Sequence, residues 1–219
     1  MNKVDIYYDH YKESFSLSKN AQKRRNKLFV ILCILEALSF LFLIKPNEVI
    51  ALFNASVSSK LDIMITFGMG VFQTLLWILI AYTLVRYCQD MLYIERLYPY
   101  LDILERKVAS ELGEPIFIRE GDRYQENYPM ILNFIDLFYK MFSPILFSLI
   151  NIVCIRTEWM NKVGINLALV CDTVIFATIM LITWFFFFEI HSKITEWFKT
   201  HVPFIGWIAK KLRKVLKEV

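Results

Sequence analysis

The chain has 219 residues, of which 57% are hydrophobic, 16% aromatic and 21% charged, and its formal net charge is +4. Soluble domains carry about 45–50% apolar residues even when glycine is counted, and the mean hydropathy here is +0.44. This composition argues against a disordered chain, a small disulfide-stapled domain and an ordinary soluble enzyme. The many Phe and Tyr residues are typical of lipid-facing and interfacial surfaces. We therefore expect an all-α membrane protein.

Four apolar stretches are each long enough to form a membrane-spanning helix, because backbone polar groups in lipid must be satisfied within the segment. The first, LFVILCILEALSFLFLI, would measure about 25 Å as a helix, just enough to cross the hydrocarbon. The predicted spans cover 28–44, 61–85, 130–155 and 165–190. The chain then divides into an arm (1–27), two spans (28–85), a central segment (86–129), two further spans (130–190) and a tail (191–219).

The distribution of Lys and Arg predicts the orientation of these spans. Basic residues concentrate in the arm and the tail, whereas 45–60 carries two Lys and 156–164 carries one Arg and one Lys. Basic residues accumulate on the cytoplasmic side of membrane proteins. Both termini and the central segment are therefore expected to be cytoplasmic, with two short loops facing outward.

The arm combines aromatic residues with a basic cluster next to the membrane. Headgroup binding and topology explain this pattern, and a phosphate-contacting patch beside stackable tyrosines is the alternative. The candidate ligand-binding residues are Tyr8, Tyr11, Lys23, Arg24, Arg25 and Lys27.

The central segment and the tail are expected to form a small cytoplasmic layer. Helical spacing of apolar residues continues the second span to about Leu112, and Pro99 should kink or interrupt that helix. The remainder, to Pro129, reads as a hairpin or ordered loop around Gly121. The tail predicts a basic amphipathic helix lying on the inner leaflet.

Charged residues within the spans are the most informative feature, since a charge in hydrocarbon normally faces protein or water. Glu36 lies about eight residues inside the first span and Lys140 about ten residues inside the third, so a Glu36–Lys140 pair is geometrically reasonable. Asp136 lies one helical turn from Lys140 and competes for it.

The third span carries a polar stripe, which would either line a pore or join the helices of one subunit. Its members are Asn133, Asp136, Lys140, Ser143, Ser148 and Asn151. In the fourth span, Asp172 would form an outer ring of negative charge in an oligomer or cap a neighbouring helix. Gln73, in the second span, joins this candidate polar network.

The sequence contains no motif for catalysis, nucleotide phosphates or metal binding, such as HExxH, GxSxG or GxGxxG. The three His residues and four Cys residues form no cluster with ligand spacing. We therefore predict a protein that is not an enzyme and needs no metal or other cofactor. An enzyme acting on lipid or cell-wall precursors stays open as a minor alternative.

The basic, Tyr-rich arm (YYDHYKES…KNAQKRRNK), the span LCILEALSFLFLIKP and the run YPMILNFIDLFYKMFSP resemble small four-span membrane effectors of bacterial anti-phage defence. The plan is most similar to the channel subunit of Hailong systems. That resemblance implies an oligomeric inner-membrane channel, held closed by a short single-stranded DNA oligomer. The membrane subunit of Kiwa systems is the second choice, and it implies a sensor coupled to a soluble DNA-binding partner.

Two functional hypotheses follow. The first is a homo-oligomeric ion channel, gated by a nucleotide or a partner protein, that depolarises the membrane and arrests growth. The second is a membrane anchor or sensor that recruits a soluble protein to its cytoplasmic face.

Overall fold

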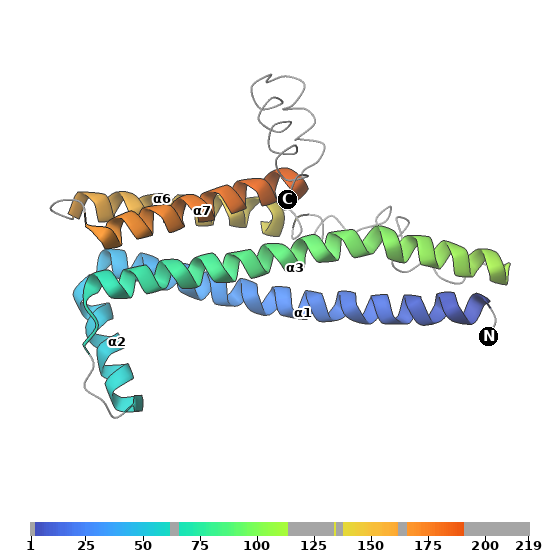
Figure 1. Cartoon of the computed structure of the whole chain (residues 1–219), viewed down its shortest axis with the longest axis horizontal. Helices are drawn as coiled ribbons and strands as arrows, with labels where there is room; N and C mark the ends of the chain where they lie inside the picture. Colours follow the sequence, from blue (N-terminus) through green and yellow to red (C-terminus); the bar gives the residue numbers. More distant parts are fainter. Residues whose placement is uncertain (1–2, 62–65, 114–133, 135–137, 162–165, 191–219) are drawn as a thin grey trace, which may run out of the picture.

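A computed structural model describes residues 3–61, 66–113, 134, 138–161 and 166–190 (Figure 1). Its elements are α1 (Lys3–Ile44), α2 (Pro46–Leu61), α3 (Met69–Leu112), the π-helical turn η1 (Phe138–Phe142), α6 (Ser143–Asn161) and α7 (Leu167–Ile190). The described part contains helices and no strand, which confirms the all-α prediction. The expected hairpin before Pro129, the stripe residues Asn133 and Asp136, and the tail lie outside the described residues.

Helices α1 and α3 form a long antiparallel pair against which the other described helices pack (Figure 1). They contain 42 and 44 residues, so each is about 65 Å long, roughly twice the thickness of the bilayer hydrocarbon. Together with α7, they are the 3 described helices that are long and apolar enough to cross a membrane. This supports a helical membrane protein in which two helices extend well past the hydrocarbon.

Among the described residues, the pair is covered along one half of its length. Helices α6 and α7 lie against the half that contains residues 28–44 of α1 and 69–85 of α3, with α6 touching α1 and α7 touching α3 (Figure 1). We call this four-helix part the bundle. Residues 4–27 of α1 and 86–112 of α3 continue beyond it as a two-helix stalk, about 36 Å long at 1.5 Å per residue.

Small residues allow the two stalk helices to approach closely. Ser14, Ser18 and Ala21 are buried on α1 at spacings of four and three residues, and Leu101 and Val108 are buried seven residues apart on α3. This repeat is the coiled-coil pattern, which keeps one seam facing the partner along both helices. The arm predicted as a separate unit is thus the first part of a single helix that runs into the bundle.

The segment after the first span is a helix, where the sequence predicted a short loop. Helix α2 leaves the end of α1 at a steep angle (Figure 1), and buried Val49 packs in one cluster with Phe42 and Phe72. The side-chain amide of Asn54 donates a hydrogen bond to the carbonyl of Phe67 and accepts one from its N–H. These two hydrogen bonds hold the segment before α3 against α2. The second span therefore starts at Met69 and not at about Leu61.

The described part of the third predicted span lies in a different register against α1 from the predicted one. Tyr139 of η1 packs edge-on against Phe29, with ring centroids 4.8 Å apart, and the Arg25 guanidinium lies over the same ring. This places Lys140 beside the basic end of the first span, and not ten residues deep as predicted. Helix α6 then continues to Asn161, past the predicted end of the span at Ile155.

Pro99 does not end α3, which continues to Leu112. A proline inside a helix removes one backbone hydrogen bond and crowds the preceding turn, but Pro99 lies on the exposed face of the stalk, where water can satisfy the freed carbonyl. Gly113 ends the helix instead, with φ of 72°, in the left-handed conformation that glycine adopts without a steric penalty.

Candidate functional site

A buried carboxylate–amide pair occupies the middle of the bundle. Asn151 Nδ2 on α6 donates to Glu36 Oε1 on α1 over 2.8 Å and to the carbonyl of Phe147 over 2.7 Å. Glu36 is 2% exposed and Asn151 1%. Asn151 is eleven residues beyond Lys140, or about 16 Å along the helix. Glu36 lies opposite Asn151, about 16 Å along the helix from Lys140. The predicted Glu36–Lys140 pair is therefore not formed.

One turn farther along both helices, Ser39 Oγ lies 3.4 Å from Cys154 Sγ. Cys154 is buried, as expected for a thiol that packs as a small apolar group. This contact extends the polar surface between α1 and α6 from the middle of the bundle toward its α2 end.

A second buried carboxylate, Glu158, lies at the end of this polar surface. Its Oε2 accepts hydrogen bonds from Gln73 Nε2 at 3.1 Å and from Trp77 Nε1 at 3.4 Å, both on α3. The sequence analysis assigned Glu158 to an outward loop and missed it. The signal was present in the spacing, because Asn151, Cys154 and Glu158 follow helical periodicity at three and four residues.

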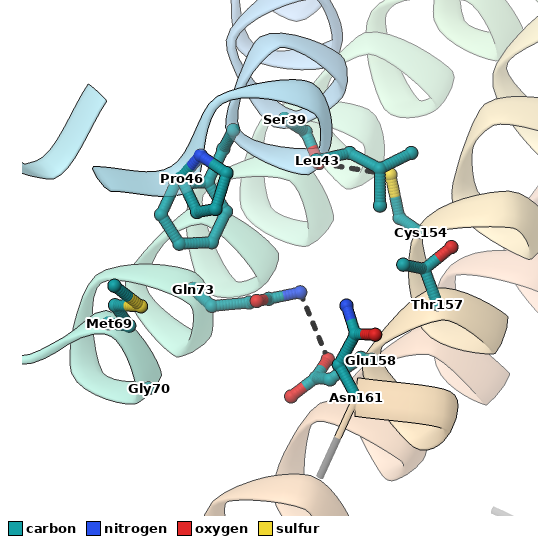
Figure 2. Close-up of a pocket in the computed structure, with 11 residues that line it drawn as sticks. Ser39, Leu43, Pro46, Met69, Gly70, Gln73, Cys154, Thr157, Glu158 and Asn161 are labelled. Atoms are coloured by element: carbon teal, nitrogen blue, oxygen red, sulfur yellow. Dashed lines mark hydrogen bonds between the residues drawn. The ribbon is translucent and has the colours of Figure 1, made fainter. Parts of the chain in front are cut away.

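These groups line a cavity of about 300 Å³ at the α2 end of the bundle (Figure 2). Gln73 reaches across it toward Glu158, while the Ser39–Cys154 contact forms another part of its wall. Thr157 and Asn161 add polar atoms, and apolar side chains complete the lining, among them Phe42, Leu43, Pro46 and Met69. The polar row formed by Glu158, Ser39, Cys154, Glu36 and Asn151 thus runs from this pocket to the middle of the bundle.

Asp172 on α7 is fully buried within the single chain. A second copy of the chain could not reach it, so the structure does not support an outer carboxylate ring built from Asp172. Its neighbour Thr173 accepts a hydrogen bond from Trp159 Nε1 at 3.1 Å, which ties α7 to α6 near the same end.

Two members of the polar stripe, Ser143 and Asn151, face the interior of the subunit. Ser143 and Asn151 are buried, and Ser148 donates to the carbonyl of Pro144 at 2.7 Å. The opposite side of α6 is exposed and apolar, with Leu149 and Ile152 on it. Of the two alternatives for the stripe, these residues fit the one in which they join the helices of one subunit.

An apolar layer separates the polar row from the stalk. Leu32, Ile80, Leu84, Phe147 and Ile179 belong to one buried cluster contributed by all four helices of the bundle. On the stalk side of this layer, Ser143 and Thr183 are buried polar residues. A small cavity of about 10 Å³ adjoins Tyr87, Ser143 and Thr183, which is close to the space that one water molecule needs.

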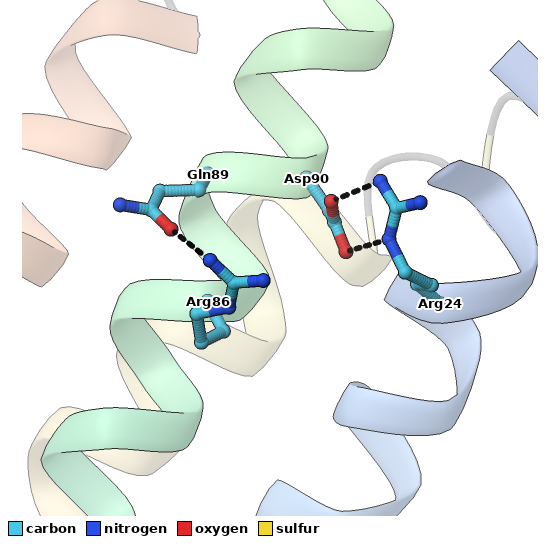
Figure 3. A network of polar contacts seen from close by, with 4 residues as sticks. All are labelled: Arg24, Arg86, Gln89 and Asp90. Atoms are coloured by element: carbon cyan, nitrogen blue, oxygen red, sulfur yellow. Dashed lines mark hydrogen bonds and ion pairs between the residues drawn. The ribbon is translucent and has the colours of Figure 1, made fainter. Parts of the chain in front are cut away.

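The predicted ligand-binding residues of the arm are partly occupied by contacts within the stalk. Arg24 Nη2 and Nε donate to both oxygens of Asp90, at 3.0 and 3.4 Å (Figure 3). These hydrogen bonds and the Asp90 charge raise the pKa of Arg24 above its ordinary value. Tyr11 donates to buried Glu105 over 3.0 Å.

The other predicted arm residues are arranged differently. Arg25 donates to the side-chain oxygen of Asn26, whereas Lys23, Lys27 and Tyr8 are exposed. The structure therefore leaves the two lysines and Tyr8 on the stalk surface and does not gather the six residues into one site.

No family model, curated protein or solved structure matches the chain. Within the described ranges, His, Cys, Asp and Glu side chains form no group of three that could hold a metal ion. The polar row and its pocket are thus characterised by their chemistry alone: buried carboxylates held by amide and indole donors, at the entrance and in the middle of a helical bundle.

Proposed function

We propose that this protein is a channel-like membrane protein that conducts cations, with α1, α3, α6 and α7 as its four spans and both termini in the cytoplasm. The observation that carries the proposal is the polar row from the pocket to Glu36. Its carboxyl groups, Glu158 at the pocket and Glu36 in the middle of the bundle, are held in place by the hydrogen bonds of Gln73, Trp77 and Asn151, and carboxyl oxygens are groups that a passing cation can meet in a pore. The predicted orientation opens the pocket to the outside.

The apolar layer would act as the gate. A cation entering at Glu158 could proceed past Ser39 to Glu36, but Ile80, Leu84 and Phe147 close the way to the stalk. Hydrophobic constrictions of this kind block ions by excluding water. The described conformation therefore corresponds to a closed state.

The stalk would deliver the gating signal. Helices α1 and α3 pass without interruption from the stalk into the bundle, so a ligand that shifts the stalk pair also shifts Glu36 and Ile80. The exposed Lys23 and Lys27 would meet a nucleotide or short single-stranded DNA oligomer there. In the setting that the defence resemblance implies, opening depolarises the inner membrane and arrests growth, with homo-oligomers as the working assembly.

Making the apolar layer polar tests directly whether the proposed path conducts ions. Ile80→Ser places a hydroxyl in the buried apolar layer, whereas Ile78→Ser makes the same change at a position that is 48% exposed on the outer face of α3. We expect the Ile80→Ser protein in liposomes to release potassium ions at least tenfold faster than the Ile78→Ser protein. Equal rates at equal folded amounts would contradict the proposed path.

The carboxylate at the entrance can be tested in the leaking protein. Adding Glu158→Gln to Ile80→Ser should lower potassium flux several-fold while leaving chloride flux unchanged. The matched control is Glu48→Gln, at an exposed glutamate of α2 that pairs with Lys45. A control that lowers the flux equally would show that Glu158 has no special place in the path.

A second function, membrane anchoring of a soluble partner, is favoured by the stalk itself. Its two helices extend about 36 Å past the bundle and expose large side chains, including Tyr8, Tyr93 and Tyr100. Under this alternative, the full-length protein in native membranes retains a specific partner that Tyr93→Ser with Tyr100→Ser releases, and Ile80→Ser causes no leak.

A further inference from the structure

Glu36 and Asn151 each carry one oxygen that their hydrogen bonds leave unused. Within the described part of the chain, neither Glu36 Oε2 nor Asn151 Oδ1 has a hydrogen-bond partner, although both atoms are fully buried. The side-chain nitrogen of Asn151 donates its two hydrogens to Glu36 Oε1 and to the carbonyl of Phe147. Two acceptors are thus left on a pair of groups that share one hydrogen bond.

Leaving two buried acceptors unpaired destabilises the folded protein, and a charged acceptor does so more than a neutral one. A single proton would satisfy both atoms. Placed on Glu36 Oε2, it turns the carboxylate into a carboxylic acid whose O–H can donate to Asn151 Oδ1. The acid and the amide would then be joined by two antiparallel hydrogen bonds in one ring.

The surroundings of Glu36 offer no compensating positive charge in the part of the chain that the structure describes. The titratable groups that interact with it are the thiols of Cys33 on its own helix and Cys154 on α6. Helices α3 and α7 contribute Ile80 and Ile179 to the same buried core. A thiolate or a second carboxylate would only disfavour ionisation of Glu36.

We propose that Glu36 and Asn151 form a proton-binding site in the middle of the bundle, occupied in the conformation described. Protonation takes one proton from water and leaves this part of the bundle neutral; deprotonation returns it and leaves a buried charge that loosens the contact between α1 and α6. The site does not depend on conduction, so it stands or falls separately from the channel proposal.

Infrared spectroscopy of the full-length protein in lipid bilayers tests the site. Wild type at neutral pH should show a carboxylic-acid C=O band that shifts in D₂O and disappears in Glu36→Gln. Glu48→Gln, the exposed control, should retain it. Glu36→Gln should also fold, because a glutamine amide can complete the same ring with Asn151. Absence of any band that depends on Glu36 would overturn the proposal.

Thermal unfolding provides the second measurement. Raising the pH should lower the melting temperature of wild type while folded Glu36 keeps a proton that the unfolded chain has released, and this contribution should be absent in Glu36→Gln. A small monovalent cation could instead bridge the two oxygens. In that case the melting temperature of wild type would rise with sodium or potassium concentration and that of Glu36→Gln would not, which would replace the proton by a metal ion.

Discussion

The bundle and the stalk are two halves of the same antiparallel helix pair, yet they satisfy their polar groups differently. In the stalk, Arg24 pairs with Asp90 although the Arg24 side chain is 55% exposed. In the bundle, Glu36 and Glu158 are held by the amide and indole donors of Asn151, Gln73 and Trp77. Water can solvate a charged partner and hydrocarbon cannot. This difference is the one expected if lipid surrounds the bundle, as proposed, and water surrounds the stalk.

The largest expected effect compares the same truncation in both halves. Leu101→Ala in the stalk and Leu32→Ala in the bundle each remove a leucine that is at most 1% exposed. The stalk change should cost about 3 kcal/mol. The bundle change should cost less, because lipid is as apolar as leucine and only packing is lost.

Local unfolding free energies from hydrogen exchange in bilayers would measure both truncations. Ile78→Ala, at an exposed position of α3, is the control for a change that touches lipid alone. Equal costs in the two halves would mean that both are surrounded by the same medium.

A smaller effect is expected from breaking the buried polar pair. Asn151→Leu removes the donor to Glu36 and should destabilise the bundle by about 2 kcal/mol, since it leaves a buried acceptor unpaired. Denaturant titration in mixed micelles can measure this. Ser148→Ala is the matched control on the same helix, because its hydroxyl bonds only to the Pro144 carbonyl of its own turn. A loss no greater than that of the control would contradict a structural role for Asn151.

The smallest effect should come from the stalk ion pair. Arg24→Ala should cost no more than about 1 kcal/mol, and less as salt is added, because an exposed pair is screened. Lys23→Ala, next to it and exposed, should be neutral. A larger, salt-independent cost measured by hydrogen exchange would place this pair in a low-dielectric medium and move the boundary toward the N-terminus.

Composition and periodicity were sufficient to predict several features. They predicted the all-α class, apolar stretches long enough to cross a membrane, and the continuation of the second span to Leu112. They also indicated that Glu36 and Asn151 are important, since a polar side chain in an apolar helix must face protein. These features are local, because they depend on the residues of one segment and on the medium around it.

The partners of these residues were decided only by the tertiary structure. Whether Glu36 meets Lys140 or Asn151 depends on how far α6 is shifted along α1, and a long apolar stretch can be moved by several turns at little cost in hydropathy. Contacts settle the register: Phe29 with Tyr139, Ser39 with Cys154 and Gln73 with Glu158. Glu158 was missed for that reason, since its burial requires α6 to continue past Arg156 and pack against α3. The sequence by itself therefore determined the helical class and which segments are apolar, while packing between distant helices decided which carboxylates are buried and what holds them.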